Sequence, residues 1–234
     1  MVLVAKIFEV KEPLELGVIA RKLKDFSEEE PHEHGGKRAK LTAEILDLKL
    51  EGGALTGIFS KDFVLSRYYK RGLVETLVTE EVPFLMKQAK ERTFLVVLAP
   101  SKARGVKKLL TNYVANKLSE ILFIKTGAII EVKITHEALK EIHESSPRAT
   151  KLIWFDDVDI PDIGKLALAG SGLADTKLYH DYLEHGRLWY IVFEVMKRGL
   201  VIGITRNAIV TLFSKTSVEE FINFIWEEVI PVIE

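Results

Sequence analysis

The sequence predicts an α+β protein with antiparallel sheets and helices packed on one face, and three observations indicate this class. Two apolar runs flank Glu51-Gly52-Gly53, a pattern typical of a β-hairpin. Residues 102–123 carry apolar side chains at helical spacing. Residues 188–230 read as three strands and an amphipathic helix, the same order as residues 73–123. This shared order predicts a tandem βββα duplication.

The N-terminal half is taken as residues 1–124. It opens with an expected strand at 2–10, and for 12–26 a short helix and an extended segment both stay open. Residues 27–38 combine a charge run with Pro31 and two glycines, which predicts an exposed, mobile loop. The remaining expected elements are strands at 41–50, 55–59, 73–78, 82–87 and 93–99, followed by the helix at 102–123.

The C-terminal half is taken as residues 125–234. Alternating or continuous apolar runs predict its strands. Its helices are predicted where an amphipathic segment begins after Ser or Thr or ends at Gly. The expected strands are 128–134, 151–155, 166–168, 188–196, 200–205 and 208–214, and the expected helices are 137–144, a segment ending at Gly186, and 217–229.

Composition excludes several classes of protein. The chain of 234 residues has no Cys, so disulfide scaffolds, Cys-based zinc sites, iron–sulfur clusters and thiol catalysis are excluded. Its start lacks a secretory apolar core and no apolar run reaches membrane-spanning length, so we expect a cytoplasmic protein without a membrane partner. Only four Asn and one Gln stand beside many Lys and Glu, which is typical of hyperthermophiles and suggests an archaeal-like source.

The stretch WYIVFEVMKRGLVIGITRNAIVTLFSKTSVEEFINFIWEEVI resembles one repeat of the TATA-box-binding-protein family. Repeats of that family end with curved antiparallel strands, a Ser/Thr-x-Glu-Glu-like helix start and a long helix on the convex face. The family also inserts pairs of Phe into the minor groove, whereas Phe193 and Phe213 are isolated in this chain. The resemblance therefore implies a repeat architecture and assigns no functional residue.

A group of cations surrounds the expected start of the helix at 102–123: Lys102, Arg104, Lys107 and Lys108. Helix N-termini favour anions through free N–H groups and the helix dipole, so four cations there are unfavourable, and an anionic partner such as phosphate would relieve their repulsion. The alternative is an ordinary solvated basic face, since the spacing matches no P-loop.

A second basic group consists of Arg67, Tyr68, Tyr69, Lys70 and Arg71. Nucleic-acid surfaces place aromatic rings between cations, because the rings stack on bases while the cations neutralise phosphates. The alternative is a loop whose Tyr pair packs against the core. Both groups lie in residues 1–124, which carry a net charge of +4, whereas residues 125–234 carry −5. The opposite charges of the halves also allow a homodimer or another protein partner.

A cluster of carboxylates follows the expected strand at 151–155. Asp156, Asp157 and Asp159 could hold Mg²⁺, which prefers oxygen ligands, although polar turns also collect Asp. None of the six histidines forms the His-Glu-x-x-His pattern of a zinc helix, and no Gly-rich nucleotide motif follows a strand, so no cofactor is expected.

These observations lead to one main hypothesis and two alternatives. The main hypothesis is a non-enzymatic nucleic-acid-associated or regulatory protein that binds a polyanion through residues 67–71 and 101–108. The first alternative is a metal-dependent phosphoesterase or nuclease that uses the Asp156–Asp159 cluster. The second is a protein–protein interaction module.

Overall fold

The structure is a computed structural model that describes residues 2–34, 37–99, 107–144 and 149–233. These residues form an α+β fold with twelve strands and five α-helices, and the predicted class with antiparallel strand pairing is confirmed. The chain divides into two compact units: unit 1 is Met1–Ile7 with Glu131–Glu234, and unit 2 is Phe8–Ile130. The halves 1–124 and 125–234 stay a prediction of domain organisation.

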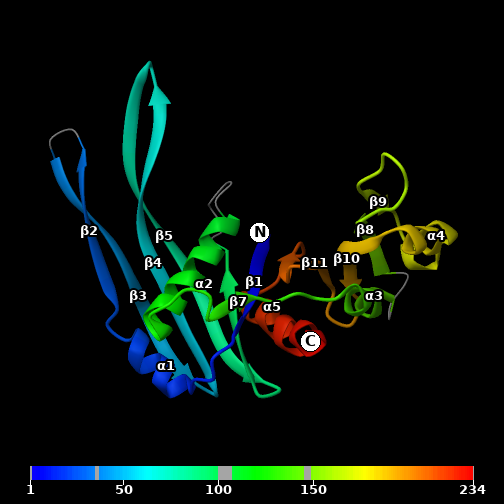
Figure 1. Cartoon of the computed structure of the whole chain (residues 1–234), viewed down its shortest axis with the longest axis horizontal. Helices are drawn as coiled ribbons and strands as arrows, with labels where there is room; N and C mark the ends of the chain where they lie inside the picture. The colour runs from blue at the N-terminus through cyan, green and yellow to red at the C-terminus, as the bar shows by residue number, and fades with distance from the viewer. Residues whose placement is uncertain (1, 35–36, 100–106, 145–148, 234) are drawn as a thin grey trace. The chain divides into compact units, whose positions relative to one another are not determined.

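Unit 2 contains an antiparallel meander of long strands. They are hydrogen-bonded in the order β2, β3, β4, β5, β6, and β1 is the next neighbour of β6. Figure 1 shows the long strands of this unit. The bounds are β1 Leu3–Val10, β2 Ser27–His34, β3 Lys37–Glu51, β4 Ala54–Tyr69, β5 Gly72–Ala89, β6 Arg92–Leu98 and β7 Ile129–Glu131, the last of which pairs with β1. The predicted hairpin around Glu51-Gly52-Gly53 is confirmed as the turn between β3 and β4.

Two helices cover one face of this sheet, α1 (Leu16–Leu23) and α2 (Lys107–Phe123), as Figure 1 shows. Of the two readings left open for residues 12–26, the helix is the one observed. The apolar core lies between the sheet and the helices, where Phe59 and Val114 are fully buried. The ring of Phe59 meets Tyr113 of α2 edge to face, with 6.0 Å between the ring centroids.

Two sequence predictions for unit 2 are wrong. The segment expected as a loop at 27–38 is strand along Ser27–His34, paired with β3 from Ser27↔Glu44 to His34↔Lys37, while residues 35 and 36 lie outside the described residues. The strands expected at 73–78 and 82–87 are a single strand, β5. In both cases the strand is largely solvated, so it carries the polar residues that usually mark loops.

Unit 1 also contains antiparallel strands, which belong to the same twelve-stranded sheet. Its strands follow the order β1, β12, β11, β10, β8, β9, and β1 enters it through residues Leu3–Lys6, which pair with β12. The bounds are β8 Thr150–Asp156, β9 Leu166–Ala169, β10 Arg187–Val195, β11 Leu200–Thr205, β12 Ile209–Leu212, α3 His136–Glu144, α4 Lys177–His185 and α5 Val218–Phe224. The expected caps are present: Ser217 accepts a hydrogen bond from the Glu220 N–H, and α4 ends at Gly186.

Each unit contains three consecutive strands followed by a helix, namely β4-β5-β6-α2 in unit 2 and β10-β11-β12-α5 in unit 1. The order predicted for residues 188–230 is confirmed, whereas residues 73–123 contain only two strands, β5 and β6, before α2, so the three-strand order predicted for that range is wrong. Common descent of the two units stays a prediction. Within the described ranges, no helix is both long enough and apolar enough to cross a bilayer.

A buried polar network joins α3, α4 and β8 in unit 1. The Tyr179 hydroxyl donates to Glu144 Oε1 at 2.8 Å and lies 2.9 Å from His143 Nε2. Because that hydroxyl proton goes to Glu144, His143 Nε2 carries a hydrogen and donates to Tyr179. His143 Nδ1 then accepts from the Thr150 hydroxyl, 3.3 Å away. His143 is fully buried, and burial lowers its pKa to about 4.

Candidate nucleic-acid interface and a polar cleft

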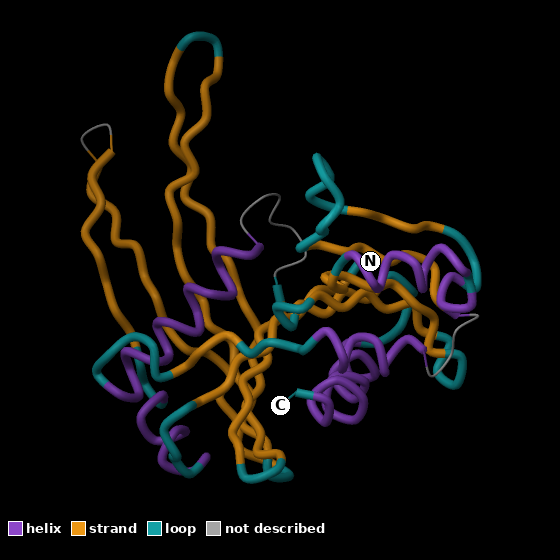
Figure 2. The backbone as a smooth tube through the Cα atoms, turned by 45° about the vertical axis from the view of Figure 1, so that its right-hand side comes forward, coloured by secondary structure: helices purple, strands orange, loops and turns teal. Residues whose placement is uncertain are grey.

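The β4–β5 hairpin is much longer than the sheet that supports it. The two strands pair without interruption from Ala54↔Lys87 to Tyr69↔Gly72. On the other side of β4, the partner strand β3 continues only as far as the Ala43↔Lys61 pair. Beyond this point residues 62–79 form a two-stranded projection, which we call the arm (Figure 2).

Asp62 stabilises the point where β3 and β4 separate. Its Oδ2 accepts a hydrogen bond from the Thr42 N–H at 3.0 Å, and its Oδ1 accepts one from the Thr79 hydroxyl at 2.6 Å. One carboxylate thus satisfies a backbone donor of β3 and a side chain of β5 where regular pairing with β3 stops. The arm therefore leaves the sheet from a defined base.

The turn of the arm consists of only two residues, Lys70 and Arg71. Both have positive φ angles, 45° and 69°, as tight hairpin turns require. Such a turn normally selects Asn or Gly, because a side chain with a Cβ is strained there by about 1 kcal/mol. The sequence instead places a cation at each of these two positions.

The arm tip, defined as Arg67–Arg71, exposes both of its tyrosines. Tyr68 is 82% exposed and Tyr69 is 62% exposed, so neither ring packs into the core. The Lys70 ammonium lies 5.5 Å from the centroid of the Tyr69 ring. Exposed aromatic rings that lie beside cations can stack on nucleobases.

The cations of the arm tip are not neutralised internally. Within the ranges that the structure describes, Arg67, Lys70 and Arg71 make no ion pair. The nearby carboxylate of Glu75 faces His32 of β2, with 3.4 Å between Oε2 and Nε2. The positive charge of the tip is therefore available to an external anion.

The basic group predicted at the start of the helix is only partly within the described residues. Lys107 and Lys108 are the first two residues of α2, and Lys102 and Arg104 lie outside the described residues. Figures 1 and 2 show the arm extending past the start of α2, so its tip lies apart from the first turn of that helix.

The carboxylates that were candidates for a metal site point to different partners in unit 1. Asp156 Oδ2 lies 2.7 Å from Arg206 Nη2, and Asp157 Oδ2 lies 3.5 Å from Arg206 Nη1. Asp159 Oδ1 is instead 2.9 Å from His185 Nδ1. No group of three or more His, Asp or Glu side chains in the described part of the chain is arranged to hold a metal ion.

Arg206 is expected to be important for the stability of unit 1. Arg206→Ala should lower the free energy of unfolding by about 2 kcal/mol, because Asp156 is largely buried and would lose its counter-ion. Asp156 Oδ1 already lacks a hydrogen-bond partner in the described structure. Urea unfolding followed by tryptophan fluorescence measures this cost. The matched control is Asp157→Asn, which removes the charge of a side chain that is 65% exposed and suits the positive φ of 51°, and an equal effect of both changes would contradict the expectation.

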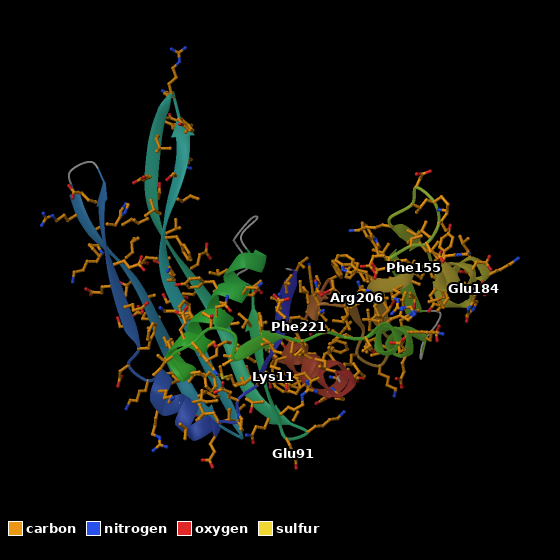
Figure 3. All side chains as sticks on the ribbon, in the orientation of Figure 1. Lys11, Glu91, Phe155, Glu184, Arg206 and Phe221 are labelled. Carbon is orange, nitrogen blue, oxygen red and sulfur yellow. The ribbon has the colours of Figure 1, made fainter. Side chains whose placement is uncertain are left out.

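A polar cleft of about 330 Å³ lies next to these carboxylates. Its walls come from α3, the segment after β8, the end of α4 and the start of β10, and they include His136, Asp157, Asp159, Glu184 and His185. Figure 3 labels Glu184 and Arg206 in this unit. His136 Nδ1 accepts the Leu188 N–H at 2.8 Å, and burial is the main cause that lowers the pKa of His136.

The His185–Asp159 pair can hold and transfer a proton, but the cleft is not lined by Ser, Thr or Cys among the described residues. The histidines of this cleft were missed by sequence reasoning because their spacing follows no metal or catalytic motif. They come together only because β8 and β10 pair antiparallel, with Asp156 opposite Arg187. A sequence pattern does not reveal that pairing.

Comparisons with protein-family models and with curated proteins find no match. The resemblance of residues 189–230 to a TATA-box-binding-protein repeat therefore stays a prediction. The candidate sites rest on their own geometry.

Proposed function

We propose that this protein is a non-enzymatic nucleic-acid-binding protein and that the arm tip is its contact surface. The observation that carries the proposal is the exposure of Tyr68 and Tyr69 between three cations that have no internal counter-ion in the described structure. The rings would stack on bases while Arg67, Lys70 and Arg71 meet phosphates. The whole chain carries a net charge of only −1, so the attraction is local to the tip.

The affinity for nucleic acid should decrease with salt concentration, and the three cations Arg67, Lys70 and Arg71 should set how steeply. Each phosphate contact releases counter-ions, so the logarithm of affinity should fall against the logarithm of salt with a slope of about −2 for single strands and about −3 for duplexes. Fluorescence anisotropy with labelled single-stranded and double-stranded RNA and DNA measures this slope. Comparison of the four probes identifies the preferred nucleic acid.

The turn offers a variant that removes charge without removing structure. Lys70→Asn combined with Arg71→Gly keeps the positive φ angles, because Asn-Gly is the pair such turns prefer. We expect this variant to reduce the salt slope to about one third and to weaken binding at low salt. Tyr68→Ala with Tyr69→Ala should leave the slope unchanged and weaken single-strand binding by about tenfold or more.

A matched control removes two exposed cations from other places in the same unit: Lys24→Ala and Lys49→Ala. It should bind as the unchanged protein does. The proposal fails if no probe binds at low salt, or if the control and the turn variant lose affinity equally.

The phosphoesterase alternative is weaker, because Arg206 and His185 engage the three carboxylates it requires. The protein-interaction alternative has independent support in the shaft of the arm.

A further inference from the structure

One edge of β5 has no strand partner over the length of the arm. Strand β6 pairs with β5 only between Phe84↔Val97 and Ala89↔Arg92. From Gly72 to Val82, no described strand lies on that edge. In a two-residue hairpin the residues flanking the turn, Tyr69 and Gly72, form a hydrogen-bonded pair. Odd-numbered residues of β5 from Leu73 onward therefore direct their backbone N–H and C=O groups outward, away from β4.

The same segment exposes large apolar side chains. Leu73 is 53% exposed, Leu77 is 50% exposed and Val74 is 38% exposed, and no helix covers either side of the arm in Figure 3. A two-stranded ribbon is marginally stable by itself in water, and a long apolar edge tends to pair with another strand. These properties indicate that another strand pairs with the free edge of β5.

The other edges of unit 2 and of the arm are less suitable for pairing. The edge strand β2 carries Glu28-Glu29-Glu30 followed by Pro31, and charges and proline are known to block strand addition. On the β4 edge of the arm, the carboxylate of Asp62 accepts hydrogen bonds from Thr42 and Thr79, so it is not available to a partner strand. The β5 edge is the one whose exposed apolar side chains lie between available charges of both signs, because the arm segment of β4 offers only Arg67 beside its exposed Leu65.

The charges on the β5 edge complement a second copy of the same edge. Lys70 and Arg71 precede its apolar segment, and Glu80 and Glu81 follow it. None of these four residues makes an ion pair in the described structure. Two such edges that run antiparallel place the cations of each copy beside the carboxylates of the other.

We propose that two copies of this protein associate by antiparallel pairing of their β5 edges about a two-fold axis at Thr76. In this register Arg71 of each copy faces Glu81 of the other, Val74 faces Val78, and Glu75 faces Leu77. All outward-directed backbone groups from residue 73 to residue 79 then find partners, because odd-numbered residues oppose odd-numbered residues. The symmetry repeats every contact twice, and the result is a four-stranded sheet made of two arms. This inference does not depend on nucleic-acid binding.

Sedimentation equilibrium of the full chain, freed of nucleic acid, tests the proposal through charge reversal. Arg71→Glu places two glutamates opposite each other at both ends of the interface, and Glu81→Arg does the same with arginines. Each change should weaken dimerisation by about tenfold or more, because like charges repel at two symmetric contacts. The combined variant, Arg71→Glu with Glu81→Arg, restores opposite charges and should recover most of the affinity.

The matched control reverses an exposed pair on the other hairpin, Glu33→Arg with Arg38→Glu, and should leave dimerisation unchanged. A further variant, Leu77→Pro, removes an outward N–H that β4 does not use and should abolish dimerisation while circular dichroism stays unchanged. The proposal is overturned by a monomer at all concentrations, by failure of the combined variant to rescue, or by a dimer that Leu77→Pro leaves intact. None of these outcomes depends on the anisotropy experiments.

Discussion

The free energy of unfolding of unit 1 is expected to fall by about 3 kcal/mol as the pH drops from 6.5 to 4. Burial lowers the pKa of His143 from its ordinary value of 6.5 to about 4, so the folded state keeps this side chain neutral over that range. The unfolded state binds a proton there and is favoured by acid. Stability is therefore full above pH 6.5 and is lost progressively towards pH 4.

Tryptophan fluorescence is a suitable probe for this experiment, because Trp154, Trp189 and Trp226 all belong to unit 1. Urea unfolding is measured across the pH range for the protein and for His143→Gln, which cannot titrate. His136 also has a lowered pKa and remains in both proteins, so the difference between their pH slopes isolates His143. Identical slopes would contradict the assignment.

Phe59→Ala is expected to lower the free energy of unfolding of unit 2 by about 3 to 5 kcal/mol. Phe59 is fully buried where β4 passes under α2, and its removal leaves a cavity beside Tyr113. Unit 2 has no tryptophan, so amide hydrogen exchange of β4 and α2 is the appropriate measurement.

The control for this variant lies six positions along the same strand and on the same face. Leu65 is 53% exposed, and Leu65→Ala should change stability by less than about 0.5 kcal/mol. Equal effects of the two substitutions would mean that the arm is as closely packed as the core.

Sequence patterns identified the elements whose two faces differ in environment. The hairpin at Glu51-Gly52-Gly53 and the helix α5 behind Ser217 were predicted because one side of each is buried and the other is solvated. The strands β2 and β5 were misjudged for the opposite reason. Residues 27–34 and 72–81 are largely solvated, so apolar alternation does not mark them as strands.

The sequence predicted the residues of the candidate site but not the projecting hairpin that carries them. The residues of the arm tip were identified by their cations and rings, but their place at the end of a projection follows from the early departure of β3 at Ala43. The acidic cluster was identified as well, while its partner Arg206 lies about fifty residues away and has no sequence signal. The position of the arm tip and the contact between Asp156 and Arg206 both depend on pairing between strands that are distant in the sequence.

The course of β1 through the two units has a practical consequence for dissecting the chain. The backbone leaves unit 1 after Ile7 and re-enters it at Glu131, so unit 2 is an inserted domain. A C-terminal fragment would lack the strand that pairs with β12. Lys6 Nζ lies 2.6 Å from Glu131 Oε1, so the two ends of the insertion site are neighbours. A short glycine-serine bridge from Ile7 to Glu131 should therefore yield an independent unit 1, into which another domain with adjacent termini could be grafted.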